Sequence, residues 1–193
     1  MTSQTPPEVR RSRRMLLAIA ALFFGSLLLA GVLRFSGWQP AATKANGELL
    51  HPPGDLRAVT AQLAAGGVYR WRQPQRTWRI ALAPPAGCTT ACVRVGQQLL
   101  TVWQLLGADS DRVHVLWIGT PPASVPRGGA LRVLAPSAAL RAGLPRLQPA
   151  AGEAKDGIPV YVIDPNGFVI LRYAPGFDPS GLRADLSKLL KLI

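Results

Sequence analysis

Residues 78–92, WRIALAPPAGCTTAC, decide the fold of this chain. Residues 78–83 alternate as a strand does, and the following Pro-Pro-Ala-Gly predicts a turn. Beyond the turn, apolar residues recur at helical spacing, which predicts a helix that begins near Cys88 or Thr89 and stops at Gly107. The stretch is therefore a strand, a turn and a helix, with both cysteines of the chain where the helix begins.

Further elements follow toward the C-terminus. Residues 112–119, RVHVLWIG, predict a central strand covered on both faces, and residues 131–144 predict a short strand and a helical turn. Residues 157–165 predict another buried strand, which Asn166-Gly167 joins to residues 168–173 in a two-residue hairpin. Asp178 is expected to cap a final helix with Pro179 at its first position. This order predicts an α/β domain over residues 68–193.

Residues 15–33 upstream contain no charge, and a helix of that length covers ~28 Å, enough to span a bilayer. A core helix would be shorter and amphipathic, and a convincing signal-peptide cleavage site is missing. We therefore expect a transmembrane anchor at residues 15–34. Four arginines precede it (Arg10, Arg11, Arg13 and Arg14) and only Arg34 follows closely, which predicts that residues 1–14 form a cytoplasmic tail. A twin-arginine export signal would deliver the domain to the same side.

Residues 35–67 are rich in Gly, Pro, Ala and Asn and lack a sustained period, which predicts a stalk or an edge decoration. A length of 193 residues then leaves room for one compact domain. The net charge is +12, but the arginines of the domain are scattered and form no lysine-rich run or aromatic-interleaved RNA motif. We exclude nucleic acid as a partner and expect anionic headgroups or an acidic membrane protein.

Cys88 and Cys92 are the candidate functional residues. Two cysteines exclude a disulfide framework and a four-cysteine zinc site. At a spacing of four on a helix they can form a disulfide or hold one metal together, and a helix N-terminus stabilises the thiolate that both chemistries need. We expect both sulfurs to face solvent outside the cytoplasm. The alternative is a structural disulfide, although so short a loop stabilises little through chain entropy.

Three motifs carry a family resemblance: the CxxxC of residues 87–92, the strand of residues 113–119 followed by Thr120-Pro121, and residues 162–167, VIDPNG. Together with the anchor, they resemble the Sco/SenC family of cytochrome c oxidase assembly over residues 78–193. The resemblance implies a thioredoxin-like three-layer domain that faces the periplasm from the inner membrane. It also implies a copper carrier or thiol reductant, with an oxidase subunit or a copper chaperone as partner.

One departure from that family concerns copper. The family places a histidine nine residues before the proline of its D-P-x-G turn, where this chain has Asp156. A carboxylate suits Cu(I) poorly, whereas thiolates and imidazole suit it. A third ligand beside Cys88 and Cys92 would have to be His51, if the stalk folds back, or His114, which otherwise packs or hydrogen-bonds within its strand. Dithiol chemistry does not need this ligand.

Pro159 stands where thioredoxin-like domains often place a cis-proline that faces the cysteines, although an ordinary trans proline at the start of a strand is the alternative.

Two hypotheses for the function follow. In the first, Cys88 and Cys92 exchange electrons with an oxidase subunit or its copper chaperone, or carry copper to it, and Cys88, nearer the turn, is the attacking cysteine. In the second, the disulfide is fixed and the basic domain is a non-catalytic scaffold of oxidase assembly. A general disulfide oxidoreductase would normally use a CxxC pair.

Overall fold

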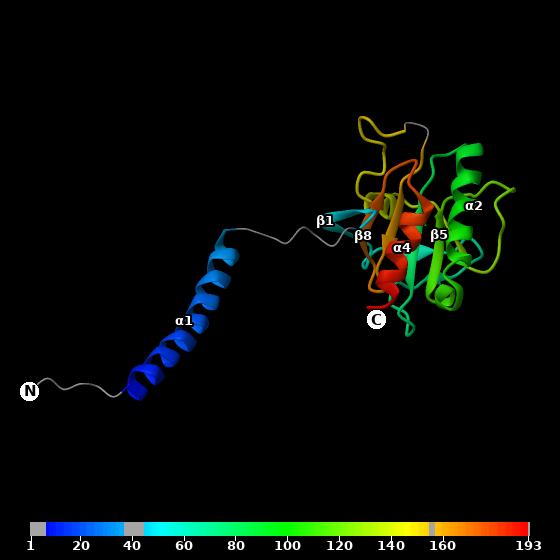
Figure 1. The fold of residues 1–193 in the computed structure, drawn as a ribbon. Helices are drawn as coiled ribbons and strands as arrows, with labels where there is room; N and C mark the ends of the chain where they lie inside the picture. Colours follow the sequence, from blue (N-terminus) through cyan, green and yellow to red (C-terminus); the bar gives the residue numbers. More distant parts are fainter. Residues whose placement is uncertain (1–6, 37–44, 155–156, 193) are drawn as a thin grey trace, which may run out of the picture. The chain divides into compact units, whose positions relative to one another are not determined.

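The computed structural model describes residues 7–36, 45–154 and 157–192 and divides the chain into two compact units, Met1–Lys44 and Ala45–Ile193. In the first unit, α1 (Pro7–Phe35) contains a candidate membrane span, Arg11–Phe35, in which 18 consecutive residues reach a mean hydropathy of 2.6 with none of them buried (Figure 1). By length and composition this helix could cross a membrane. The anchor expected at residues 15–34 lies within it.

The second unit is built on one sheet in the order β1-β8-β7-β4-β5-β6 (Figure 1). Its strands are β1 (Glu48–Asp55), β4 (Trp78–Leu82), β5 (Val113–Ile118), β6 (Leu131–Leu134), β7 (Val160–Ile163) and β8 (Phe168–Tyr173). β4, β5 and β6 are parallel, whereas β7, β8 and β1 are added antiparallel on the other side of β4. β4 is therefore central, as expected of a strand whose five residues are all buried.

The two faces of the sheet carry different layers. Trp78, Ile80 and Leu82 belong to a core cluster with residues of α2 (Thr90–Gln104) and α4 (Pro179–Leu190), so these helices cover one face. Ala81 faces the opposite way and packs with Leu140 of α3 (Ala138–Ala142) and with residues of β1 and β3. The second face is thus covered by α3 and by the segment that contains β2 (Ala61–Gln62) and β3 (Val68–Tyr69). The predicted α/β class and its three layers are confirmed.

The N-terminal boundary of the domain differs from the expected one. β1 lies in the segment expected to be a stalk or an edge decoration, and it is an edge strand paired with β8; Leu56 just after it is fully buried. The pairing is irregular between Leu49 and Gly54, where the segment contains two prolines. Proline is tolerated on edge strands and a bulge breaks the alternation of side chains, so the sequence shows no strand period here. Residues 37–44 lie outside the described part of the chain.

The later elements match their predictions closely. α2 begins at Thr90 and ends at Gln104, and η1 (Gly107–Arg112), a 3₁₀-helix, leads into β5. Asp178 caps α4 by accepting a hydrogen bond from the Ser180 N–H, and Pro179 is its first residue. The β7–β8 turn is longer than the predicted two residues, because the Asp164 carboxylate accepts hydrogen bonds from the N–H groups of the next residues and extends the turn.

Candidate redox site

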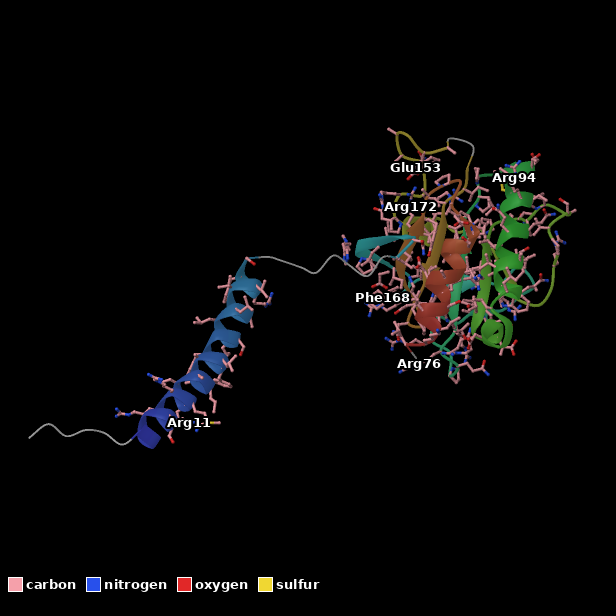
Figure 2. All side chains as sticks on the ribbon, viewed as in Figure 1. Arg11, Arg76, Arg94, Glu153, Phe168 and Arg172 are labelled. Atoms are coloured by element: carbon pink, nitrogen blue, oxygen red, sulfur yellow. A yellow bond between two sulfur atoms is a disulfide. The ribbon has the colours of Figure 1, made fainter. Side chains whose placement is uncertain are left out.

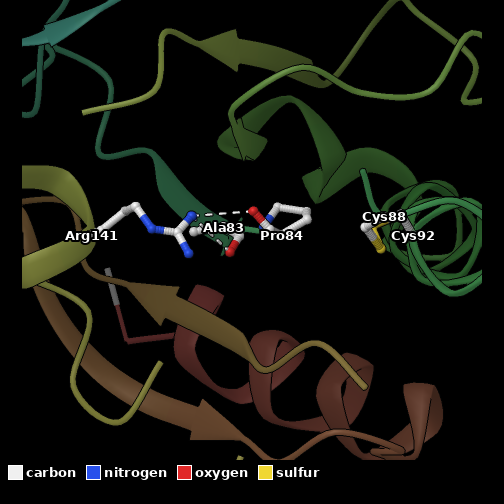
Figure 3. Close-up of a disulfide and its surroundings, with 5 residues drawn as sticks. All are labelled: Ala83, Pro84, Cys88, Cys92 and Arg141. Atoms are coloured by element: carbon white, nitrogen blue, oxygen red, sulfur yellow. Dashed lines mark hydrogen bonds between the residues drawn. A yellow bond between two sulfur atoms is a disulfide. The ribbon is translucent and has the colours of Figure 1, made fainter. Parts of the chain in front are cut away.

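Cys88 and Cys92 form a disulfide at the start of α2, with their Cα atoms 5.8 Å apart (Figure 3). Cys88 ends the loop that follows β4, and Cys92 lies in the first turn of the helix. The two cysteines differ in exposure: Cys92 is fully buried in the core cluster, whereas Cys88 is half-buried at its edge. Both cysteines are expected from the sequence to face solvent, but only Cys88 is even partly exposed, because the inner side of α2 carries Cys92 into the core.

The loop before Cys88 is held by Arg141 of α3. One of its guanidinium nitrogens, Nη1, donates hydrogen bonds of 3.2 Å to the carbonyl oxygens of Ala83 and Pro84 (Figure 3). Gly87, with φ of 74°, then makes the left-handed turn into Cys88, which an L-residue with a side chain rarely adopts. Sequence reasoning missed Arg141, since nothing near it in the chain shows that it contacts a loop almost sixty residues away.

Cys88 lies between two hollows on the surface. The larger, about 960 Å³, we call the Cys88 groove, and it is lined by residues 85–91, Arg94, Val95, Gln98, Ala154, Gly157, Ile158, Gly176 and Phe177. The smaller, about 490 Å³, we call the Arg141 hollow, and it is lined by residues 84–88, Cys92, residues 117–120, Pro136 and Arg141. A reaction partner can therefore approach the Cys88 side of the disulfide.

The wall of the Cys88 groove opposite α2 includes Ala154, which follows the partly buried Glu153, the partner of an arginine in an ion pair. The Arg172 guanidinium, 1% exposed, donates two hydrogen bonds of 2.7 Å to the carboxylate of Glu153 (Figure 2). Hydrogen bonding to Arg172 lowers the pKa of Glu153 to about 2, so the pair is ionised at neutral pH. The pair therefore holds this edge of the groove in place.

The electrostatic environment of Cys88 is positive. Arg94 and Arg141 are the charged residues in the two linings, and none of the described lining residues carries a carboxylate. The N–H groups at the start of α2 add to this field, because the first turn of a helix leaves them without helical partners. Such surroundings favour a thiolate at Cys88 once the disulfide is reduced.

Neither histidine lies with the cysteines. His114 pairs with Arg79 near the beginning of the parallel strands, whereas Cys88 follows their carboxyl ends, ~10 Å or more away at ~3.3 Å per residue. His51 is in β1, which β8 and β7 separate from β4, so at ~4.8 Å per strand it is ~14 Å away from that strand. Across the described residues, no group of three or more His, Cys, Asp or Glu side chains could hold a metal ion, and Asp156 lies outside them. The donors present do not fit a Cys, Cys, His copper site.

His114 instead belongs to a buried network. The fully buried Arg79 donates from Nε to the Tyr69 oxygen at 3.0 Å, and the Tyr69 hydroxyl lies 2.9 Å from Nδ1 of His114, to which it can donate. Burial, followed by the charges of Arg132 and Arg79, lowers the pKa of His114 to about 4. His114 is therefore neutral at physiological pH and pairs with the Tyr69 hydroxyl. This agrees with the alternative that His114 is a hydrogen-bonded residue of its strand and not a metal ligand.

The Ile158–Pro159 bond is trans, since the one cis peptide bond in the described ranges joins His51 to Pro52. Ile158 lines the Cys88 groove, whereas Pro159 is buried and is not part of the lining.

The sheet order, the helices on one face and a disulfide at the start of the first of them define a thioredoxin-like domain with a CxxxC pair. The family described as "Transmembrane-like, thioredoxin-like, C-terminal domain" matches residues 78–193, more than half of the chain, and the chain belongs to this family. No curated protein matches the sequence.

Solved structures of similar fold include two Sco proteins and T. cruzi GPX1. BsSco, a member of the Sco family of cytochrome c oxidase assembly proteins in which a disulfide switch was identified, is 15% identical with a TM-score of 0.52, over 80% of this chain and 100% of that one. Yeast Sco1 with copper bound is 12% identical with a TM-score of 0.53, over 79% and 96%. T. cruzi GPX1 is 14% identical with a TM-score of 0.51, over 71% and 97%. At these identities the likeness concerns the fold.

Proposed function

We propose that this protein is a membrane-anchored, periplasm-facing thiol–disulfide exchange protein of cytochrome c oxidase assembly. The observation that carries the proposal is the asymmetry of the Cys88–Cys92 pair: Cys88 is half-buried and lines a groove at the start of a helix, whereas Cys92, bonded to it, is fully buried. In such a pair, one cysteine can react with a partner disulfide, and the second can then attack the mixed disulfide and release the partner. The assembly role is suggested by the family resemblance and by the Sco proteins among the structural neighbours.

The exchange would proceed in two steps. In the reduced protein, the Cys88 thiolate attacks one sulfur of a partner disulfide, so that a mixed disulfide forms and the other partner sulfur leaves as a thiolate that takes a proton from water. Cys92, after losing its proton to water, then attacks the Cys88 sulfur and releases the second partner thiol. The partner gains two electrons and the protein returns to its disulfide form.

A trapping experiment tests the order of these steps. With Cys92→Ser the first step can occur and the second cannot, so a disulfide-linked adduct between Cys88 and its partner should accumulate in membranes and disappear on reduction. Cys88→Ser leaves only the buried Cys92 and should give no adduct. Adducts recovered only from Cys88→Ser would reverse the assignment of the attacking cysteine.

The second candidate function is a scaffold with a structural disulfide. The complete burial of Cys92 favours it, because a sealed sulfur resists reduction. Equilibration of the full chain in detergent with dithiothreitol redox buffers separates the two candidates. A reduction potential between about −270 and −120 mV would support exchange, and one below about −300 mV would support the scaffold.

The role in oxidase assembly needs its own test. Cells that carry Cys88→Ser in place of the natural protein should show reduced cytochrome c oxidase activity per unit of membrane protein, and an added reduced thiol should restore part of it. Unchanged oxidase activity, together with normal adducts from Cys92→Ser, would show that the exchange activity serves another membrane or secreted protein.

A further inference from the structure

The Cys88 groove has a wall formed by a second stripe of α2. Ala91, Arg94, Val95 and Gln98 line the groove and follow the spacing of one helix face. The buried stripe of the same helix consists of other residues: Cys92, Gly96, Leu99 and Val102. Val95 of the groove-facing stripe is partly buried and also packs against the core, whereas Arg94 is exposed, so the stripe presents Arg94 to a partner.

Arg94 is the one charged residue among the described residues of this groove. Its side chain is exposed, and no hydrogen bond or ion pair joins it to any part of the chain that the structure describes. Figure 2 shows it on α2, at the end of the domain where Glu153 and Arg172 also lie. Two described carboxylates of this end have partners: Glu153 binds Arg172, and Asp178 caps α4. Within the described part of the domain, Arg94 therefore presents a positive charge with no ion-pair partner, within two helical turns of Cys88.

The opposite wall offers backbone and apolar surface. Gly157, Ile158, Gly176 and Phe177 lie across from α2 and add no charge. A groove with one cation, two threonines and a glutamine on one side and apolar surface on the other fits a polypeptide segment better than a small ion. The charge decides which segments bind well, because an acidic residue gains a partner at Arg94 and a basic residue is repelled.

We infer that the Cys88 groove selects partner segments in which an acidic residue flanks the reacting cysteine, and that Arg94 is the residue that recognises this acid. The inference rests on the proposed exchange function and specifies its substrate class. Arg141, on the other side of the loop, is bound to the Ala83 and Pro84 carbonyls and adds to the positive field without facing this groove.

Two synthetic peptides test the inference. Each contains one cysteine joined as a mixed disulfide to thionitrobenzoate, and the cysteine is flanked by two aspartates in one peptide and by two lysines in the other. The reduced full-length protein in an uncharged detergent is mixed with each peptide, and the released thionitrobenzoate is followed by its absorbance. Division by the rate of dithiothreitol with the same peptide removes differences in intrinsic reactivity.

The corrected rate should be higher for the acidic peptide than for the basic one at low salt, and the ratio should shrink at high salt. Arg94→Ala should reduce this ratio by about three- to fivefold, the size of one exposed ion pair, and Arg94→Glu should reverse the preference. Arg94→Lys should retain most of it. Arg183→Ala, which removes another exposed arginine, from α4 and outside the groove, is the matched control and should leave the ratio unchanged.

The same ratio in Arg94→Ala as in the natural protein would overturn the inference, since the preference would then come from the overall charge of +12. A protein that releases thionitrobenzoate from neither peptide would instead contradict the proposed exchange function. The two failures are thus distinguishable.

Discussion

At the scale of single residues, the two cysteines differ in how deeply they are buried. Both belong to one CxxxC motif, yet Cys92 is fully buried and lines only the Arg141 hollow, whereas Cys88 is half-buried and lines both hollows. The phase of α2 causes this difference. Cys92 lies on the same face of the helix as Leu99 and Val102, and this face packs into the core. The sequence predicted the motif, but the phase of the helix against the sheet decided which sulfur a partner can reach.

A residue-scale prediction concerns His114. Its pKa of about 4 lies below the ordinary 6.5, and its charged and titratable neighbours are Arg79, Arg132 and Tyr69. Between these pH values the unfolded chain binds a proton that the folded protein does not, so His114 should make the protein less stable as the pH falls from about 6.5 to about 4. Discounted for partial exposure, the loss is about 1–2 kcal/mol.

Urea unfolding at pH 7.5 and pH 5 checks this, with His114→Gln as the comparison. The variant should lose less stability than the natural protein between the two pH values. An equal loss in both proteins would mean that other groups cause the acid sensitivity.

At the scale of elements, β1 depends on contacts with a helix distant in sequence. The Asp185 carboxylate of α4, 3% exposed, accepts hydrogen bonds from the N–H groups of Asn46 and Gly47 and from the Tyr173 hydroxyl. Burial raises the pKa of Asp185, but these hydrogen bonds outweigh burial, and the pKa is below its ordinary value. A carboxylate in α4 thus fixes the start of the edge strand.

Asp185→Ala should therefore lower the free energy of unfolding by about 2–4 kcal/mol, because several buried donors lose their acceptor together. It should also speed amide hydrogen exchange in residues 46–50 more than in β4. Asp111→Ala, which removes an exposed acid, is the control. Unchanged exchange at residues 46–50 would show that pairing with β8 alone holds the strand.

At the scale of the whole molecule, two properties can be predicted: the binding of Cu(I) and the orientation of the chain in the membrane. The described residues bring no histidine to the cysteines. In an anaerobic Cu(I) titration against a competing chelator, we therefore expect the chelator, and not the reduced full-length protein, to hold the Cu(I). His51→Ala and His114→Ala should give the same result as the natural protein. Tight stoichiometric binding that Asp156→Ala or either histidine variant abolishes would support copper as cargo and contradict the donor argument.

Topology gives the second prediction at this scale. Four arginines precede the apolar stretch of α1 and one follows it closely, so a periplasm-dependent reporter fused after residue 193 should be active and a cytoplasm-dependent reporter should be silent. Replacement of Arg10, Arg11, Arg13 and Arg14 by glutamine should shift part of the population to the opposite result. Retention of one orientation in that variant would contradict the charge argument.

The sequence by itself determined the order of the elements from β4 to α4, the cysteine pair at the start of α2 and the apolar N-terminal helix. These features depend on local periodicity, turn residues and caps, which act over a few neighbouring residues. Only the tertiary structure decided that β1 joins the sheet, that Arg141 holds the cysteine loop, that the histidines lie away from the cysteines and that Arg94 is the charged residue among the described residues of the groove. The physical reason is that each of these depends on contacts or distances between residues far apart in the chain, which local patterns do not encode.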